Sequence, residues 1–115
     1  MKLFSRTDEY LLIAVWRLQE DAYGVRIRET LQSMTGKKWS FGTIFVALER
    51  LVDQELLTSH LGEPQPVRGG RSKRFYTLTL RGREALLAIH SLQNSVWEEV
   101  SVAALRNGLQ PGGAN

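Results

Sequence analysis

The chain of 115 residues has no cysteine, only three prolines and no long apolar run. Without cysteine there is neither a disulfide framework nor a thiolate metal site, as is usual for proteins of the reducing cytosol. The longest apolar run, residues 10–16, is far shorter than the roughly 20 residues that a membrane span needs. The first residues also lack the apolar segment of a signal peptide. We therefore expect a cytoplasmic protein that does not associate with membranes.

Histidine is scarce as well, since the chain contains only His60 and His90. The two are far apart in the sequence, so no nucleophile–base pair is suggested. Transition-metal ions prefer clustered cysteine or histidine ligands, which this chain does not offer. We expect no catalytic residue, no metal site and no cofactor, and we expect that the protein is not an enzyme.

What is present is the composition of a single globular domain, with 43% apolar residues. The formal net charge is +3 and the isoelectric point is about 9.6. This mild basic bias permits a polyanionic partner without requiring one.

Residues 40–57 form the most informative stretch. Ser40 can cap a helix, because its hydroxyl can accept a hydrogen bond from a free backbone N–H of the first turn. The predicted buried face consists of Phe41, Ile44, Phe45, Ala47, Leu48, Leu51 and Val52. The opposite face begins with the small, uncharged Gly42, Thr43 and Val46. Slim side chains suit a helix that enters the DNA major groove, although an ordinary amphipathic helix explains the same residues.

Two further helices are predicted before this one. The first is capped by Ser5 or Thr7 and ends near residues 20–21. The second covers residues 25–34 and stops at Gly36, a residue that readily adopts the left-handed conformation of a helix end. A helix, a short break and a second helix with slim leading residues resemble a helix-turn-helix.

After these helices, the alternating patterns of residues 57–61 and 75–80 predict two strands. The loop between them contains two prolines and two adjacent glycines, which exclude regular structure. From position 68 to 83 the basic residues, with no acidic residue among them, are Arg68, Arg71, Lys73, Arg74, Arg81 and Arg83. Such a loop can follow a phosphate backbone or enter a minor groove. The alternative is a solvated loop that its charge keeps soluble.

The last predicted helix runs from residue 80 to 106, with Thr79 as its cap. It would be about 40 Å long, whereas a domain of this size has a radius of gyration of roughly 13 Å. The helix must therefore project, and its apolar stripe needs a second copy of the chain. The predicted dimerisation residues are Leu86, Ile89, Leu92, Val96, Trp97 and Val100. We divide the chain into a DNA-binding domain (1–79), a dimerisation helix (80–107) and a tail (108–115).

In order and spacing, several segments resemble the PadR family of bacterial transcriptional regulators, over residues 7–97. They are L-L-I-A-V-W-R-L-Q-E-D-A-Y-G-V-R-I, S-F-G-T-I-F-V-A-L-E-R-L, E-L-L-T-S and G-G-R-S-K-R-F-Y-T-L-T-L-R-G-R-E-A-L. The single C-terminal helix is similar to the small-subunit branch of that family. The implied fold is α+β, mostly α: a winged helix-turn-helix with a long C-terminal dimerisation helix.

The resemblance also implies roles for individual residues. It assigns the recognition helix to Ser40, Thr43 and Phe45, the wing to Gly70, Arg71, Lys73 and Arg74, and the turn before the second helix to Tyr23 and Gly24. From charge and position we add Arg26, Lys37, Lys38, Val46, Arg50 and Arg68 as DNA contacts. The chain departs from the family pattern at Phe41 and Ser72, where proline is common, and at Phe45, where tyrosine is common.

The expected function is that of a homodimeric regulator, in the family usually a repressor, on a palindromic operator in double-stranded DNA. Small members of the family can sense drugs or aromatic acids. In this chain the aromatic candidates for a pocket that binds a planar aromatic effector are Tyr10, Trp16 and Trp97. The plainer interpretation places Trp16 in the core and Trp97 in dimer packing. The rival function is a winged-helix module that binds proteins and no nucleic acid.

Overall fold

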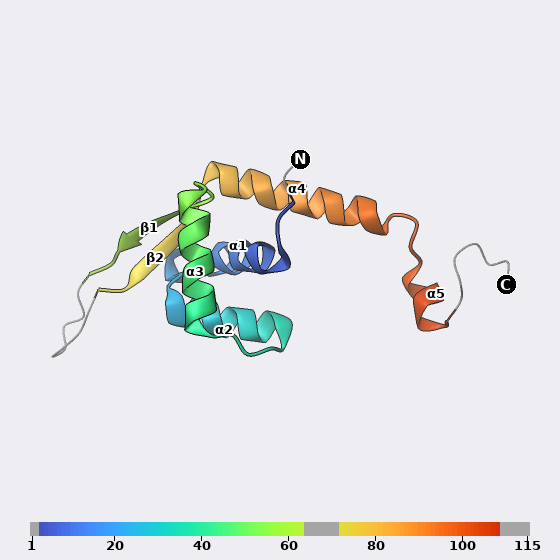
Figure 1. The fold of residues 1–115 in the computed structure, drawn as a ribbon, viewed down its shortest axis with the longest axis horizontal. Helices are drawn as coiled ribbons and strands as arrows, with labels where there is room; N and C mark the ends of the chain where they lie inside the picture. The colour runs from blue at the N-terminus through green and yellow to red at the C-terminus, as the bar shows by residue number, and fades with distance from the viewer. Residues whose placement is uncertain (1–2, 64–71, 109–115) are drawn as a thin grey trace.

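The computed structural model describes residues 3–63 and 72–108 (Figure 1). The elements are α1 (Arg6–Leu18), the short 3-10 helix η1 (Gln19–Asp21), α2 (Gly24–Thr35), α3 (Phe41–Asp53), β1 (Leu57–Leu61), β2 (Arg74–Leu78), α4 (Leu80–Trp97) and α5 (Val102–Arg106). Mostly helical, with one two-stranded antiparallel sheet, this is the predicted α+β winged-helix arrangement.

The helices begin and end where local chemistry dictates. The Ser5 hydroxyl accepts a hydrogen bond from the backbone N–H of Asp8 at 3.1 Å, so Ser5 caps α1 and Thr7 lies inside the helix. Gly36 ends α2 with φ of 70°, as predicted from its freedom to adopt a left-handed backbone. Ser40 caps α3, which also matches the prediction.

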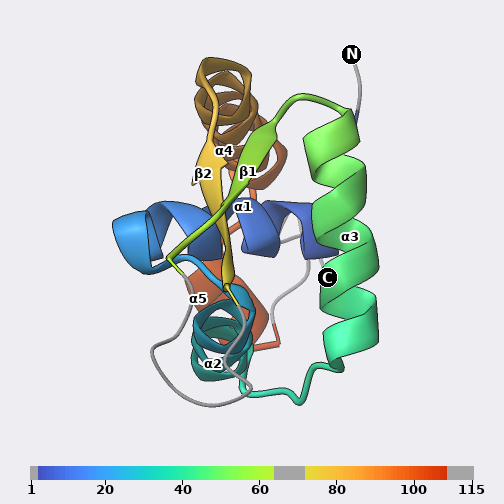
Figure 2. The same ribbon diagram turned by 90° about the vertical axis from the view of Figure 1, so that its left-hand side faces the viewer.

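The core lies where α1, α2 and α3 meet behind the sheet (Figure 2). Its fully buried large side chains are Leu11, Leu12, Val15, Ile27, Leu31, Ile44, Leu48, Leu51 and Leu57. The predicted buried face of α3 is wrong at Phe41 and Phe45, which are 45% and 54% exposed. Both lie at the edge of that face and border a hollow between α2, α3 and β2, so the core does not cover them.

The sheet is a hairpin whose second strand contacts the residue just before α2. In its register Leu57 pairs with Leu78 and Leu61 with Arg74. An isolated bridge joins Tyr23 to Phe75, so the chain just before α2 lies along β2. We call β1, β2 and the segment that joins them the wing.

The prediction that the second strand continues to residue 80 is wrong, because β2 ends at Leu78. The Thr79 hydroxyl accepts from the backbone N–H of Gly82 at 2.9 Å, so Thr79 caps α4 as predicted and Leu80 is the first helical residue. A Cβ at Gly82 would lie 2.2 Å from the carbonyl oxygen of Leu56, so only glycine fits this contact. The tight contact fixes the start of α4 against the turn after α3.

The prediction of one helix over residues 80–106 is also wrong, because residues 98–101 separate α4 from α5. Ser101 has an extended backbone, and its hydroxyl accepts from the N–H of Ala104 at 3.0 Å. A serine that caps a new helix competes with continuation of the old one. We call residues 80–108 the arm, and residues 3–63 and 72–79 the body.

The arm projects past α1 in Figure 1. Its predicted apolar stripe is divided, because Ile89 is buried and Leu86 packs against the core of the same chain. Val96, Trp97 and Val100 further along are exposed. Among the described helices none is long and apolar enough to cross a bilayer.

Candidate nucleic-acid interface

The leading end of α3 is open and uncharged. The Ser40 hydroxyl accepts from the N–H of Thr43 at 3.1 Å and donates to Thr43 Oγ1 at 2.9 Å. Ser40 is therefore engaged within the helix, whereas the Thr43 hydroxyl can still donate its own proton outward. A Cβ at Gly42 would meet nothing within 4 Å, and Val46 is among the exposed apolar residues. This end of the helix can approach another molecule closely.

The connection between α2 and α3 is fixed by polar contacts that the sequence did not reveal. Arg28 Nε donates to the carbonyl oxygen of Trp39 at 2.8 Å, and the Arg28 guanidinium lies 4.5 Å from the Phe41 ring centroid. Trp39 Nε1 donates to Thr35 Oγ1 at 3.0 Å. Nothing in the local sequence distinguishes Arg28 from Arg26 as a structural residue. The difference arises because the fold places Trp39 and Phe41 beside Arg28. These contacts set the angle at which α3 is presented.

The predicted phosphate-contact residues before and on α3 differ in their surroundings. Lys37 and Lys38 are exposed in the turn, and Arg26 is exposed beside Glu29, with 3.3 Å between Arg26 Nη1 and Glu29 Oε2. Such an exposed pair is weak and can exchange for another anion.

Arg50 is held by the body itself. Its guanidinium forms an ion pair with Asp8, which is only 7% exposed and is the one buried charged side chain among the described residues. Asp8 lies on α1, so this pair ties α1 to α3. Removing one partner of a buried pair leaves the other uncompensated. The main role of Arg50 is therefore to join α1 and α3. Only the exposed part of its side chain is free to contact a DNA phosphate.

The base of the wing carries the described part of the predicted cationic loop. Lys73 Nζ lies 4.1 Å from the Tyr23 ring centroid, and Tyr23 meets the edge of Phe75 with 5.4 Å between ring centroids. Arg74 Nη1 donates to Ser59 Oγ at 3.1 Å. Tyr23 thus anchors the wing to the start of α2. The predicted wing residues Arg68, Gly70 and Arg71 lie outside the described residues.

Tyr76 joins the wing to α3. Its ring is buried and its hydroxyl donates to Glu49 Oε1 at 3.4 Å. Burial, followed by the nearby Glu49 carboxylate, raises the pKa of Tyr76 to about 12. The phenol therefore stays protonated and remains a donor at neutral pH. Nothing in the local sequence around Tyr76 identified this partner on α3.

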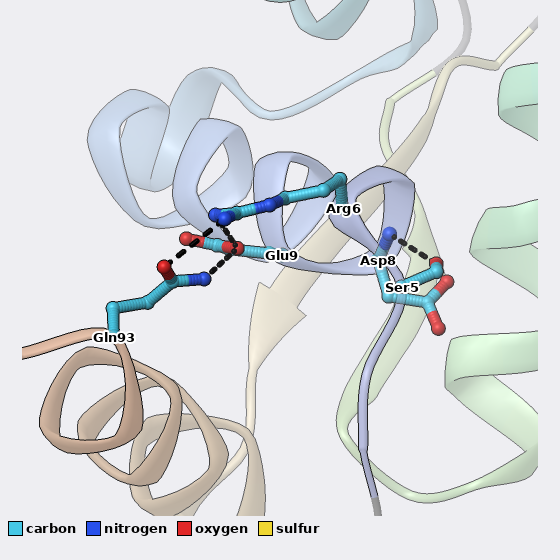
Figure 3. Close-up of polar contacts among 5 residues, drawn as sticks. All are labelled: Ser5, Arg6, Asp8, Glu9 and Gln93. Carbon is cyan, nitrogen blue, oxygen red and sulfur yellow. Dashed lines mark hydrogen bonds and ion pairs between the residues drawn. The ribbon is translucent and has the colours of Figure 1, made fainter. Parts of the chain in front are cut away.

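On the far side of α1, a polar cluster joins the body to the arm (Figure 3). Arg6 Nη1 lies 3.1 Å from Glu9 Oε1, and Arg6 Nη2 donates to Gln93 Oε1 at 3.0 Å. Gln93 Nε2 donates to Glu9 Oε1 at 3.4 Å. The first turn of α1 therefore contacts α3 through Asp8 and α4 through Arg6 and Glu9.

The three aromatic residues predicted for an effector pocket do not share a hollow within one chain. Tyr10 borders a hollow with Met34 and Trp39, whereas Trp16 borders another below the wing with Phe75. The interpretation of Trp16 as a core residue is wrong, because its side chain is 47% exposed. Trp16 lines the hollow below the wing and is not part of the buried core cluster. Trp97, at the end of α4, is 48% exposed.

A helix-turn-helix whose second helix presents an open face, followed by a two-stranded wing with a cationic base, defines a winged helix-turn-helix protein, a class that binds DNA. Residues 12–88 match the model of the transcriptional regulator PadR-like family. Because this match covers more than half of the chain, the chain belongs to that family. It is a DNA-binding transcriptional regulator and not an enzyme.

Solved structures share the fold. A PadR family transcription regulator from Clostridium difficile R20291 is 20% identical, with a TM-score of 0.62 over 89% of this chain and 97% of that chain. A PadR family regulator from Eggerthella lenta DSM 2243 is 20% identical, with a TM-score of 0.63 over 78% and 76%. RosR of H. salinarum is 21% identical, with a TM-score of 0.63 over 90% and 84%. No curated protein matched the chain.

Proposed function

We propose that the protein is a homodimeric repressor that binds a palindromic operator with the leading end of α3. The observation that carries this proposal is the open, uncharged surface around Gly42, Thr43 and Val46, presented beside the cationic base of the wing. An ordinary solvated helix would be lined there with charged side chains. The winged-helix protein-binding module has no need for both features together.

Base recognition in this proposal rests on few side chains. Thr43 can donate to a base-edge acceptor, and the Val46 methyl groups can contact a thymine methyl. Ser40 acts indirectly, because its hydroxyl holds the first turn of α3 and the Thr43 side chain in place. Phe45 is exposed on the side of α3 that faces the wing, and in this proposal it would lie beside the contacted bases.

The phosphate contacts supply affinity that depends on salt and not on sequence. We assign them to Arg26, Lys37, Lys38, Lys73 and Arg74, together with Arg68 and Arg71 and the Gly70 backbone outside the described residues. Arg50 adds a minor contact because Asp8 already engages it.

Dimerisation is assigned to the arm. Val96, Trp97 and Val100 are exposed close together in the sequence, and Leu92 is half-buried beside them. Exposed apolar surface of this kind marks an interaction site, and the simplest partner is a second copy. A twofold dimer would place two α3 helices in successive major grooves about 34 Å apart. Occupation of a promoter by this dimer would repress transcription.

The effector part of the proposal concerns Trp97, which would face its twin across the interface and leave space for a planar aromatic ligand. Its half-exposed ring supports this role. Titration with a planar aromatic cation should quench tryptophan fluorescence, and the quenching should disappear in Trp97→Phe. Quenching that persists in Trp97→Phe would remove Trp97 from the site.

An electrophoretic shift against the protein's own upstream DNA, at low and moderate salt, tests the function as a whole. We expect one retarded species, competed by specific DNA far better than by unrelated duplex. Selection from a random DNA pool should then yield an inverted repeat. A protein that ignores duplex DNA even in dilute buffer would leave the protein-binding module as the better explanation.

A further inference from the structure

The body contains a large apolar groove between the start of α2, the outer face of α3 and β2. Its volume is about 600 Å³. Ile44, Leu48 and Tyr76 line it, and all three are buried residues of the core. Phe41 and Phe45 border it from α3 and are about half exposed. We call this hollow the α3–wing groove.

The groove explains why two phenylalanines on the predicted buried face of α3 are exposed. Leaving two aromatic rings in water is unfavourable, because burial of apolar surface stabilises a protein by roughly 25 cal/mol per Å². Concave apolar surfaces with a few polar groups at the edge are the usual form of small-molecule sites. The exposed rings are therefore surface that a ligand could cover.

The charged side chains at the groove indicate whether a ligand there would be an anion or a cation. Lys73 and Arg74 line it, and none of the described residues that line it is acidic. Lys73 Nζ lies over the ring of Tyr23, which is another lining residue. Arg74 has one hydrogen bond to the neutral Ser59, so most of its five N–H donors remain for another acceptor. The described lining residues therefore leave positive charge at this apolar site without an acidic partner.

We propose that the α3–wing groove binds a flat, apolar organic monoanion, with its ring system between Phe41, Phe45 and Tyr23 and its anionic group at Lys73 and Arg74. This site differs from the effector site considered at Trp97, which lies on the arm and needs two chains. A ligand in the groove would lie beside the leading end of α3 and compete with DNA. That last consequence rests on the proposed function, whereas the binding itself does not.

The test uses 2-naphthoate and its neutral analogue 2-naphthamide, titrated into the full chain without DNA and followed by backbone amide NMR. We expect saturable shifts at Gly24, Gly42 and Lys73 with naphthoate. The amide should bind at least about tenfold more weakly, because it lacks the charge-assisted hydrogen bonds. Equal affinity of the two probes, or shifts concentrated on the arm near Trp97, would overturn the proposal.

Variants locate the two halves of the site. Lys73→Gln with Arg74→Gln should weaken naphthoate about tenfold and leave naphthamide nearly unchanged. Phe45→Ser should weaken both probes, and its amide spectrum shows whether the fold is retained. The matched control is Lys37→Gln with Lys38→Gln, which removes the same charge outside the groove. Equal loss of naphthoate binding in this control would show a general charge effect and contradict the site.

Competition is tested separately on the DNA complex. Naphthoate should raise the apparent Kd for DNA in the unaltered protein, and a ternary complex at saturating naphthoate would overturn the competitive part of the proposal. Failure of the chain to bind any DNA would count against the proposed function alone, because the NMR titration contains no DNA.

Discussion

The body and the arm differ in how their apolar and charged side chains are buried and paired. In the body, the large leucines of α1, α2 and α3 are fully buried, and the buried charge on Asp8 is paired with Arg50. In the arm, the strongly apolar Val96, Trp97, Val100 and Leu105 are exposed. The core of the body is packed by residues of its own chain, and exposed apolar side chains of the body such as Phe41 and Phe45 border the α3–wing groove. In the arm, by contrast, most of the exposed large apolar side chains gather near the end of α4 and in α5. The difference is consistent with our proposal that the body provides the fold and the arm provides the dimer interface.

The largest effect is expected from Gly42→Glu at the leading end of α3. A Cβ there meets nothing within 4 Å, so the body should fold normally. An acidic side chain facing phosphates costs several kcal/mol, so DNA affinity should fall by about 1,000-fold. An electrophoretic titration measures this loss, and circular dichroism checks the fold. Ser33→Glu adds the same charge near the end of α2 and should bind DNA much as the unaltered chain does. Retained operator affinity in Gly42→Glu would contradict the role of α3.

The second-largest effect is expected from a substitution in the arm, and an equally exposed tryptophan in the body serves as its control. Trp97→Asp should convert the dimer to a monomer and weaken operator binding by about 100-fold through loss of avidity. Trp16→Asp changes an equally exposed tryptophan in the body and should leave the assembly unchanged. Sedimentation equilibrium measures both. If Trp16→Asp dissociates the protein and Trp97→Asp does not, the arm is not the dimer interface.

A smaller effect is expected from Arg71→Ala with Lys73→Ala in the wing. Loss of two phosphate contacts should weaken binding to all sequences and reduce the slope of log K against log salt by about 1.8. Titrations at several salt concentrations on operator and random DNA measure this slope. Unchanged operator binding at every salt concentration would mean that the wing does not touch phosphate.

The smallest effect is expected on stability, from loss of the hydrogen bond between Tyr76 in the wing and Glu49 on α3. Tyr76→Phe should lower the free energy of unfolding by about 1 kcal/mol, because the Glu49 carboxylate loses a donor. Since the folded pKa of about 12 exceeds the ordinary value of 10, the native state holds the phenol proton more tightly. The contribution is complete below pH 10 and is lost as pH rises toward 12. Denaturant unfolding between pH 9 and 12 should show this decline in the unaltered chain and lack it in Tyr76→Phe.

Local chemistry was predictable from the sequence. Ser5, Ser40 and Thr79 were each identified as cap candidates, and each accepts a backbone N–H three residues ahead. Such a contact depends on residues within one helical turn, so the sequence contains all its partners. The end of α2 at Gly36 was predictable for the same reason. The hairpin was predictable on another ground, the alternating pattern of its two strands with turn residues between them.

Contacts between distant segments were not predictable. The basic character of Arg50 indicated a phosphate contact, but its partner Asp8 lies 42 residues away. Helical spacing placed Phe45 on the buried face, although only the position of β2 decides how far that face is covered. The apolar spacing predicts one continuous last helix, whereas residues 98–101 interrupt it and Ser101 caps the separate helix α5. The assigned base and phosphate contacts remain predictions.

The first turn of α1 has a consequence for the geometry of any dimer. Neighbouring residues there connect α1 to α3, through Asp8 and Arg50, and to α4, through Glu9 and Gln93. In the dimer that we propose, these contacts would link the twofold axis between the arms to the position of each α3. The distance between the half-sites of the proposed operator would then depend on the contacts of this first turn as well as on the arms.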